Sequence, residues 1–312
     1  MADICIWNRC NNNCAMCTNP ISFRNSNDSF LYSKGEVLAR LEGWRKKYLA
    51  DRENINLTGG EPTIHPDFLS LVKGIRRMLP ANKIVMATNG RMFSYPLFAQ
   101  KYLTLDNLSL EVALHGPNER LHDAVTGVRG SFKQTVRGIR NILKYRKKTH
   151  ELELRIVITK QNYRMVGRTT AFIKKEFPGV DRLVLIFMEM EGLVAENFKT
   201  VGLNYRTFNS FLSLTKFRKW TKGLDEVRLY HFPLCVLSPQ FWPYIWRTLR
   251  GNEVVFLPRC RKCRYRKYCL GIHRDYLELV GDKEFQPIKK KINIEAQDFF
   301  YHPITKIVVD PR

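Results

Sequence analysis

The stretch Cys10-Asn-Asn-Asn-Cys14-Ala-Met-Cys17 places three cysteines within eight residues. A loop of this length can turn all three thiolates toward a single metal cluster. A [4Fe–4S] cubane normally takes four cysteine thiolates, so three protein ligands leave one iron open. An open iron can be chelated by the amino and carboxylate groups of a small molecule. The alternative is a zinc site with Cys5 as fourth ligand, although Cys5 also suits a buried free thiol within a strand.

Two further motifs follow predicted strands. Thr58-Gly59-Gly60-Glu61-Pro62-Thr63 comes directly after the apolar stretch 55–57, and Thr88-Asn89-Gly90 ends the stretch 83–88. Glycines let a backbone approach a ligand closely, and a glutamate can accept hydrogen bonds from an ammonium group. On its own a Gly-Gly-Glu-Pro run would indicate a turn. Ligand-binding loops of a barrel follow its strand ends, so the order of these motifs predicts one shared site.

Taken in order, these motifs resemble the signature of the radical S-adenosylmethionine (SAM) superfamily. The resemblance implies that Cys10, Cys14 and Cys17 bind a [4Fe–4S] cluster whose open iron chelates SAM. Met16 stands where members usually carry an aromatic residue against the adenine, and methionine also packs well against ring edges. The run from His122-Asp123 to Gly130-Ser131-Phe132 resembles the same region of peptide-modifying members. The residues assigned to the cofactor so far are Met16, Gly59, Gly60, Glu61, Pro62 and Asn89.

Two predicted strands add polar residues that suit a barrel lumen. In the stretch 107–115 a period of two puts Glu111, Ala113 and His115 on one face and aliphatic residues on the other. This polar face makes Glu111 and Ala113 candidate SAM contacts, whereas His115 suits a ligand contact and a packed loop histidine equally. Arg155, in the stretch 152–159, can pair with the SAM carboxylate if it points inward, or lie on the surface.

Apolar strands alternate with amphipathic helices along most of the chain. The predicted strands are 2–7, 55–57, 83–88, 107–115, 152–159 and 182–190, and the main predicted helices are 33–52, 67–79, 132–148, 165–177 and 205–221. Six strand–helix pairs predict an α/β fold, which the resemblance specifies as a partial (β/α)6 TIM-like barrel. A further strand is expected at 227–232. The predicted domains are the barrel (1–222), a small auxiliary-cluster domain (223–280) and a C-terminal extension (281–312).

A second cysteine set lies near the end of the chain and comprises Cys235, Cys260, Cys263 and Cys269. Four thiolates can fill a second [4Fe–4S] cluster or a structural zinc site. The Cys-x2-Cys-x5-Cys segment resembles part of the SPASM/Twitch auxiliary-cluster motif, which implies an iron–sulfur cluster. The full SPASM pattern has seven cysteines and two clusters, so this chain supports one auxiliary cluster. Six Lys or Arg residues between positions 259 and 267 are expected to stabilise the cluster's negative charge, with phosphate binding as the alternative.

Composition bounds the class of protein. The chain has 312 residues, of which 44% are hydrophobic, and a net charge of +23. It has no recognisable signal peptide and no apolar run near the roughly 18 residues of a membrane span, so we expect a cytoplasmic protein that does not enter a membrane. Two clustered cysteine sets in a reducing compartment indicate metal sites rather than disulfides. The basic charge is compatible with a nucleic-acid partner or with a solvated surface.

The C-terminal signature is similar to that of maturases of the His-Xaa-Ser peptide system (HxsC type). It runs from Tyr230-His-Phe-Pro-Leu-Cys235 through Phe241-Trp242-Pro243 to Gly271. This resemblance implies reductive cleavage of SAM, hydrogen abstraction by a 5′-deoxyadenosyl radical, and modification of a ribosomally made peptide. The implied partners are a peptide or protein substrate and a flavodoxin- or ferredoxin-type electron donor, with a partner maturase left open. Two alternatives remain: a tRNA- or nucleobase-modifying radical SAM enzyme, and a non-enzymatic zinc protein associated with nucleic acid.

Overall fold

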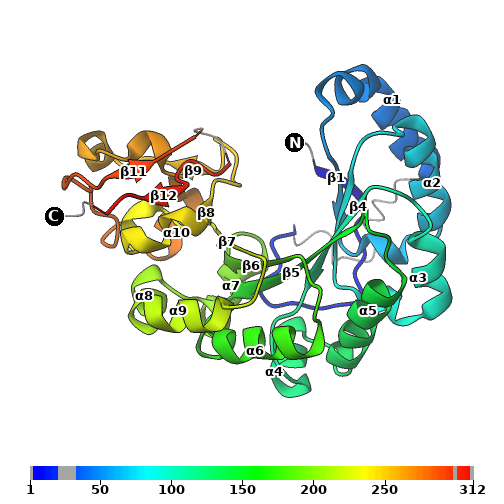
Figure 1. The fold of residues 1–312 in the computed structure, drawn as a ribbon, viewed down its shortest axis with the longest axis horizontal. Coiled ribbons are helices and arrows are strands. Elements are labelled where there is room, and N and C mark those ends of the chain that lie inside the picture. Colours follow the sequence, from blue (N-terminus) through cyan, green and yellow to red (C-terminus); the bar gives the residue numbers. More distant parts are fainter. Residues whose placement is uncertain (1–2, 20–32, 298–300, 310–312) are drawn as a thin grey trace.

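One open, curved sheet organises the computed structural model, which describes residues 3–19, 33–297 and 301–309 (Figure 1). Its eight strands are all parallel and follow one another in sequence order, with β1 and β8 at the two edges. They are β1 (Asp3–Trp7), β2 (Ile55–Gly59), β3 (Ile84–Thr88), β4 (Leu108–Ala113), β5 (Glu151–Ile158), β6 (Arg182–Phe187), β7 (Glu226–Tyr230) and β8 (Ile245–Trp246). The predicted α/β partial barrel is therefore confirmed, with eight strands in place of six. Residue 2 of the first predicted strand lies outside the described residues.

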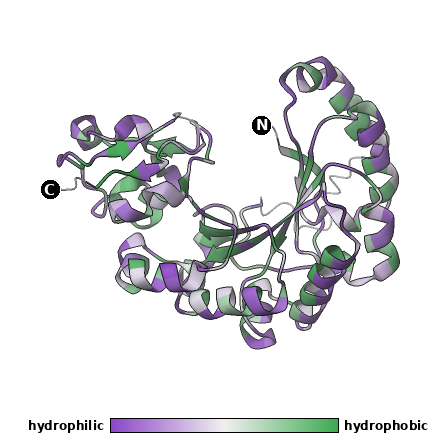
Figure 2. Ribbon diagram, viewed as in Figure 1, coloured by the Kyte–Doolittle hydropathy of each residue, from purple (hydrophilic) through white to green (hydrophobic). Residues whose placement is uncertain are grey.

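The helices cover the outer, convex face of this sheet (Figure 1). They are α1 (Lys34–Asp51), α2 (Phe68–Met78), α3 (Pro96–Tyr102), α4 (Glu119–Thr126), α5 (Ser131–Tyr145), α6 (Val166–Glu176), α7 (Leu193–Val201), α8 (Tyr205–Phe211) and α9 (Leu214–Thr221). Figure 2 shows hydrophobic strands lined by helices whose outer sides are hydrophilic. This is the pattern of a parallel sheet packed under helices, where burial of apolar side chains drives folding.

Strand alternation decides which side chains face the helices. In β4, Leu110 and Val112 are fully buried, whereas Glu111 and Ala113 are only partly covered. Successive strand residues point to opposite faces, so the aliphatic set packs beneath the helices and the polar set lies on the inner face. The predicted division of this strand into two faces agrees with this burial pattern.

Two predicted elements differ from the structure. The strand expected over 182–190 ends at Phe187, and residues 188–192 form a loop before α7, a helix that the sequence analysis did not predict. The single helix expected over 205–221 is two helices, α8 and α9. Ser213 separates them because its side chain accepts a hydrogen bond from the Lys216 amide (3.3 Å) and so caps a new helix.

The C-terminal third adds short elements beyond the barrel. They are β9 (Val254–Val255), β10 (Ile272–His273), α10 (Arg274–Leu279), β11 (Ile294–Glu295) and β12 (Lys306–Ile307). β9 pairs with β10 and β11 with β12, both antiparallel. The sheet itself extends past residue 222 through β7 and β8. In the described part of the chain, no helix combines the length and apolar character that a bilayer crossing requires.

Candidate metal centres

The first cysteine loop leaves the carboxyl end of β1. The Cys10 thiol is the most exposed of its three, and Cys14 and Cys17 are partly buried. The Asn12 amide donates a hydrogen bond to the Cys10 sulfur over 3.3 Å, and the Asn89 side-chain amide lies 4.0 Å from it. Burial raises the pKa of Cys10 to about 11, and these two donors oppose the shift. A cluster that takes this sulfur as thiolate must therefore displace a proton at neutral pH.

Three separate segments of the barrel hold the cysteine loop in place. The Asn13 amide donates to the Thr126 carbonyl (2.8 Å) at the end of α4. The Arg91 guanidinium donates to the Asn12 side chain (2.8 Å) and to the Asn11 carbonyl. At the other end of the loop, the Leu193 amide at the start of α7 donates to the Cys17 carbonyl (3.0 Å). The loop is thus fixed by contacts that are distant in sequence, and Arg91 and α7 were both missed by the sequence analysis.

The Gly59-Gly60 pair is required by the protein's own backbone. A Cβ on Gly60 would lie 2.2 Å from the Arg9 carbonyl oxygen, and Gly59 has φ +146° with the Trp7 carbonyl oxygen 2.1 Å from its Cβ position. The Gly60 amide donates to the Trp7 carbonyl over 2.6 Å. Only glycine tolerates this approach and this φ, so the motif allows the end of β2 to pack directly against the backbone that leads into the cysteine loop.

Glu61 is the buried centre of the Gly-Gly-Glu-Pro loop, with 1% of its surface exposed. Its carboxylate accepts hydrogen bonds from the Thr88 hydroxyl (2.6 Å), the Asn89 amide (2.7 Å), and the Thr63 amide (3.1 Å) and hydroxyl. Burial raises the pKa of Glu61, and these donors oppose that rise. Pro62, next to it, is also buried. Glu61 therefore joins the loops after β2 and β3, and its expected contact with an ammonium group stays a prediction.

Arg155 is neither a surface arginine nor an unpaired one. Its guanidinium lies 2.5 Å from Glu111 on β4 and 2.5 Å from Glu153 on its own strand, and 5.8 Å from the centre of the Tyr230 ring. Burial acts to lower the pKa of Arg155, but the two carboxylates outweigh it and raise that pKa. Ala113 is the cross-strand neighbour of Arg155. Glu111, Ala113 and Arg155, which were predicted on the inner face, thus lie together, although their contacts with SAM stay predictions.

The ion pair of Arg155 belongs to a longer ladder across the inner face, which the sequence analysis did not find. Arg182 on β6 pairs with Glu153 (3.1 Å) and Glu226 (2.7 Å), and Arg228 pairs with Glu226 (2.6 Å). Glu153, Arg182 and Glu226 occupy the same register on three neighbouring strands. Acidic and basic residues at matching positions of successive strands were the signal that would have revealed it.

Two other candidates are packed residues. His115 is 3% exposed, and its ring nitrogen accepts a hydrogen bond from the Val157 amide (3.4 Å) while the ring stacks on His122 at 5.8 Å between centres. This supports the packed-histidine interpretation. Met16 is 6% exposed and belongs to the hydrophobic core. Cys5 is a free, partly buried thiol, and burial raises its pKa.

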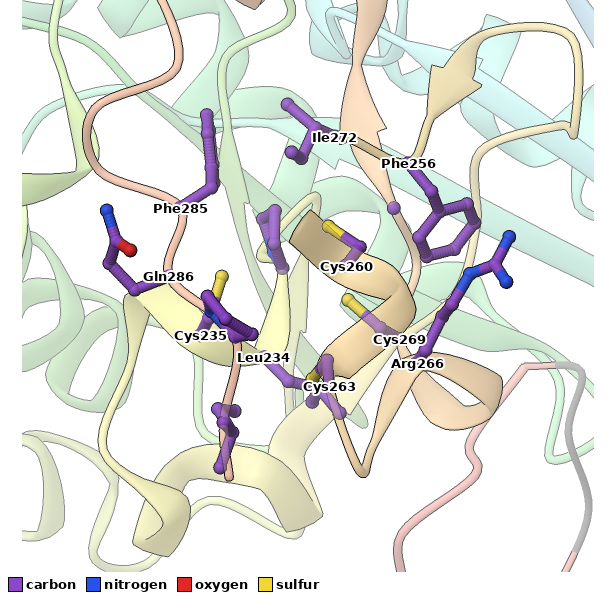
Figure 3. A pocket seen from close by; sticks show the side chains of 14 residues that line it. Leu234, Cys235, Phe256, Cys260, Cys263, Arg266, Cys269, Ile272, Phe285 and Gln286 are labelled. Atoms are coloured by element: carbon purple, nitrogen blue, oxygen red, sulfur yellow. The ribbon is translucent and has the colours of Figure 1, made fainter. Parts of the chain in front are cut away.

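The second cysteine set lines one pocket of about 390 Å³ (Figure 3). Figure 3 shows the Cys235, Cys260, Cys263 and Cys269 side chains pointing toward one another across it. Burial raises the pKa of Cys235 to about 12, and the neighbouring thiols act in the same direction. Burial also raises the pKa of Cys269. The pocket therefore gathers four sulfurs from three segments of the chain around one shared space.

The walls of this pocket come partly from an unexpected segment. The stretch 285–288, in the predicted C-terminal extension, closes one side, and the Gln286 amide donates to the Cys235 sulfur. The Gly271 and Leu234 amides donate to Cys269. Amide donors to sulfur favour the thiolate form and tune a bound cluster. Of the six basic residues expected to surround the cluster, Arg266 alone lines the pocket, over the Phe256 ring at 5.1 Å.

The remaining five point elsewhere. Arg259 pairs with Asp282, Arg264 donates to the Lys289 carbonyl (2.7 Å), and Lys267 has its ammonium 4.9 Å from the centre of the Tyr268 ring. Arg261 and Lys262 are exposed. A run of charges in the sequence therefore does not become a shell around the thiols.

An iron–sulfur cubane and a zinc site require different distances between their cysteine sulfurs. In a tetrahedral zinc site with bonds of about 2.3 Å, the sulfurs lie about 3.8 Å apart. Among the described residues, which include all eight cysteines, the only three His, Cys, Asp or Glu ligand atoms within 4.8 Å of one another belong to Glu189, Glu191 and His273. In neither cysteine set do three sulfurs lie within 4.8 Å of one another. The iron–sulfur clusters expected at the two cysteine sets stay predictions.

Comparisons with known sequences agree with this geometry. The model of the Radical SAM superfamily matches residues 4–173. A probable GTP 3′,8-cyclase of Sulfurisphaera tokodaii is 30% identical over 146 residues, which cover 47% of this chain and 44% of the relative. The mycofactocin maturase MftC of Mycolicibacterium smegmatis is 28% identical over 165 residues, which cover 52% of this chain and 39% of the relative. The matches thus span less than half the length of these two relatives.

Solved structures share the fold at low sequence identity. SuiB of Streptococcus suis bound to its precursor peptide SuiA superposes with a TM-score of 0.56 and 16% identity, covering 72% of this chain and 47% of SuiB. The FeFe-hydrogenase maturase HydG of Carboxydothermus hydrogenoformans gives a TM-score of 0.53 and 14% identity, covering 77% of this chain and 54% of HydG. Because the superfamily model covers more than half of the residues, and the open parallel barrel and the three-cysteine loop agree with it, the chain belongs to the radical SAM superfamily.

Proposed function

We propose that the chain is a SAM-cleaving enzyme that modifies a peptide and carries two [4Fe–4S] clusters. Cys10, Cys14 and Cys17 would hold the SAM-binding cluster, and the four cysteines of the C-terminal pocket would hold the auxiliary one. When bound, the first cluster and SAM supply a 5′-deoxyadenosyl radical that abstracts a hydrogen atom from the substrate. The observation that carries this proposal is the convergence of four thiols on one pocket beside a radical SAM barrel.

Three features support a peptide as the substrate. The relative MftC is named as a maturase, and the fold matches that of SuiB, whose structure contains a precursor peptide. The sequence of the C-terminal segment resembles peptide maturases of the His-Xaa-Ser system. The sheet is open between β1 and β8, which leaves its inner face uncovered by further strands. An extended chain fits such an opening better than it fits a closed barrel.

The residues of this chain have defined tasks in the proposed reaction. The loops after β1, β2 and β3 hold the cofactor side of the site, because Gly60, Glu61 and Asn89 fix them to one another through short hydrogen bonds. The ladder from Glu111 to Arg228 presents balanced charge on the inner face and orients polar groups of the substrate. Preorganised charges of this kind cost little reorganisation when the substrate binds.

A nucleotide or nucleobase substrate is the second candidate. It is favoured by the relatives named as GTP 3′,8-cyclases and by the net charge of +23. This candidate predicts nucleic-acid or nucleotide binding that weakens steeply between about 50 and 200 mM salt. The third interpretation, a zinc protein without enzymatic activity, predicts a colourless chain.

The test is anaerobic reconstitution followed by two assays. We expect about eight iron atoms per chain, four for each cluster. Any small peptide that is found to be encoded beside this gene should change in mass when it is incubated with SAM and a reductant, whereas GTP should not be consumed. Cys263→Ala should retain SAM cleavage without peptide and lose most of the peptide product. Consumption of GTP with an unchanged peptide would favour the nucleotide candidate instead.

A further inference from the structure

A cluster of two carboxylates and a histidine lies outside both cysteine sets. Glu189 and Glu191 stand on the loop between β6 and α7, and His273 is on β10, 82 positions beyond Glu191. One ligand atom of each residue lies within 4.8 Å of the other two. The His273 Nε2 atom is 2.9 Å from Glu191 Oε1. This spacing needs only small side-chain rotations to bring the three atoms around one ion.

A second histidine orients one of these carboxylates. His231 Nδ1 lies 3.3 Å from Glu189 Oε1 and 3.1 Å from the Phe187 carbonyl oxygen. Its backbone has φ +69°, which is unfavourable for a residue with a side chain, and the Tyr205 hydroxyl donates to its carbonyl over 2.7 Å. The fold thus keeps His231 in an unfavourable backbone conformation, which places its ring beside the Glu189 carboxylate.

The state of His273 points to a ligand. The residue is 5% exposed, its Nε2 is directed at the carboxylates, and its Nδ1 is buried with no hydrogen-bond partner. To bind a metal, Nε2 must expose its lone pair and the ring proton must move to Nδ1. Among the described residues no group donates a hydrogen bond to Nδ1, so none of them opposes this tautomer.

We propose that Glu189, Glu191 and His273 bind one divalent transition-metal ion, with His231 holding Glu189 from outside. One imidazole and two carboxylates are a donor set suited to Mn²⁺, Fe²⁺ or Zn²⁺. Residues that contact ligating carboxylates from outside are a regular feature of such sites, and His231 Nδ1 lies 3.3 Å from Glu189. Three protein ligands leave at least one coordination position for water or for an oxygen atom of a substrate.

The site lies between the two cysteine sets along the fold. Gly192, directly after Glu191, has its Cβ position 2.6 Å from the Cys17 carbonyl oxygen, so the loop that carries the carboxylates rests on the first cysteine loop. His273 comes two residues after Gly271, whose amide donates to Cys269. An ion here ties the barrel to the auxiliary segment. This inference is independent of the peptide or nucleotide identity of the substrate.

The test uses Mn²⁺ as the probe and holoenzyme with both clusters loaded and oxidised. Free Mn²⁺ is followed by its electron paramagnetic resonance signal during titration. We expect one saturable site per chain, weakened by about tenfold or more in Glu189→Gln and in Glu191→Gln. Glu196→Gln is the matched control, because it removes one charge from an exposed position of α7 and should bind as the native protein does.

Three results would overturn the proposal. The first is a native holoenzyme with no saturable Mn²⁺ site, and the second is unchanged binding in both Glu→Gln variants. The third is a native holoenzyme that has no Mn²⁺ site but whose Glu→Gln variants lose thermal stability. Glu189, Glu191 and His273 would then stabilise the fold through hydrogen bonds alone. Iron content and far-UV circular dichroism of each variant show whether it is folded. Because the native titration needs no variant, the proposal is decided even if the variants fail to fold.

Discussion

At the scale of single residues, Glu61 shows how a buried charge can hold a site together. Its carboxylate receives hydrogen bonds from Thr63, Thr88 and Asn89, which belong to two different loops. In Glu61→Gln an NH₂ group replaces one of the two carboxylate oxygens. The donors that pointed at this oxygen would then face another donor and lose their acceptor. Leaving buried donors unpaired costs about 1–3 kcal/mol. We therefore expect the free energy of unfolding in urea to fall by this amount.

The matched control for this prediction is Glu278→Gln, which makes the same chemical change at an exposed position of α10. Its free energy of unfolding should stay within about 0.5 kcal/mol of the native value. Equal stability of the native protein and Glu61→Gln would show that the hydrogen bonds around Glu61 do not stabilise the fold.

A second residue-scale prediction concerns pH. Burial lowers the pKa of His115 to about 3 and that of His122 to about 4, below the value near 6.5 of an unfolded chain. Folding therefore favours the neutral rings. The stability that they contribute is complete above about pH 6.5 and is lost as the pH falls toward the folded-state values. For His122 the loss is on the order of 3 kcal/mol.

The measurement is urea unfolding at about pH 7 and at about pH 4.5, for the native protein and His122→Gln. In the native protein the His115 amide donates a hydrogen bond to His122 Nδ1 over 3.1 Å. The side-chain oxygen of glutamine can accept this hydrogen bond in place of Nδ1. The variant should lose less stability between the two pH values. Equal losses in both proteins would place the acid sensitivity elsewhere, because effects of cluster loss are common to both.

At the scale of elements, the contact between the first two strand ends positions the cysteine loop. A Cβ on Gly60 would lie 2.2 Å from the Arg9 carbonyl oxygen and 2.7 Å from that of Asn8. Gly60→Ala must therefore displace the backbone just before Cys10. A displacement near 1 Å in a reacting geometry costs about 10²-fold in rate. We expect a comparable fall in 5′-deoxyadenosine formation, measured by chromatography, together with lower iron content.

Gly43→Ala is the control for this substitution. Gly43 lies in α1 with nothing within 4 Å of its Cβ position, and alanine favours helices by roughly 1 kcal/mol over glycine. This variant should keep full iron content and activity. Full activity of Gly60→Ala would mean that the close approach at the strand end does not position the cysteines.

The elements that the sequence predicted are those with strong local patterns. The strands up to β6 combine β-branched residues with a motif at their end, so their order and type were predictable. β8 has two residues and α7 follows a loop at Gly192, and neither carries a pattern long enough to detect. The break between α8 and α9 depends on a single capping serine, Ser213, within a continuous apolar period.

The candidate site was predictable where chemistry is local in sequence. Both cysteine sets, Glu61 and Asn89 stand in recognisable motifs. Arg91, the stretch 285–288 and the carboxylates near His273 act through contacts over long sequence separations, which a single sequence does not display. The pairing of Arg155 with Glu111 was not predicted for the same reason, since it depends on strand register, and the contact of Arg155 with SAM stays a prediction.

At the scale of the whole molecule, the parallel sheet places four of the proposed ligand loops at the carboxyl ends of its strands. The cysteine loop, the Gly-Gly-Glu-Pro loop and the Thr-Asn-Gly loop follow β1, β2 and β3, and the loop with Glu189 and Glu191 follows β6. Carboxyl ends of parallel strands collect functional loops in barrel enzymes generally. The C-terminal segment continues from β8 at the open edge, so it adds a second cysteine pocket without closing the sheet (Figure 1).

The central claim is that Cys10, Cys14 and Cys17, near the start of the chain, hold a [4Fe–4S] cluster whose open iron carries SAM. The most direct measurement is 5′-deoxyadenosine released from SAM by anaerobically reconstituted protein reduced with dithionite. We predict release by the native protein and none by Cys14→Ala. Native protein that forms no 5′-deoxyadenosine, or a Cys14→Ala variant that forms as much as the native protein, would contradict the account.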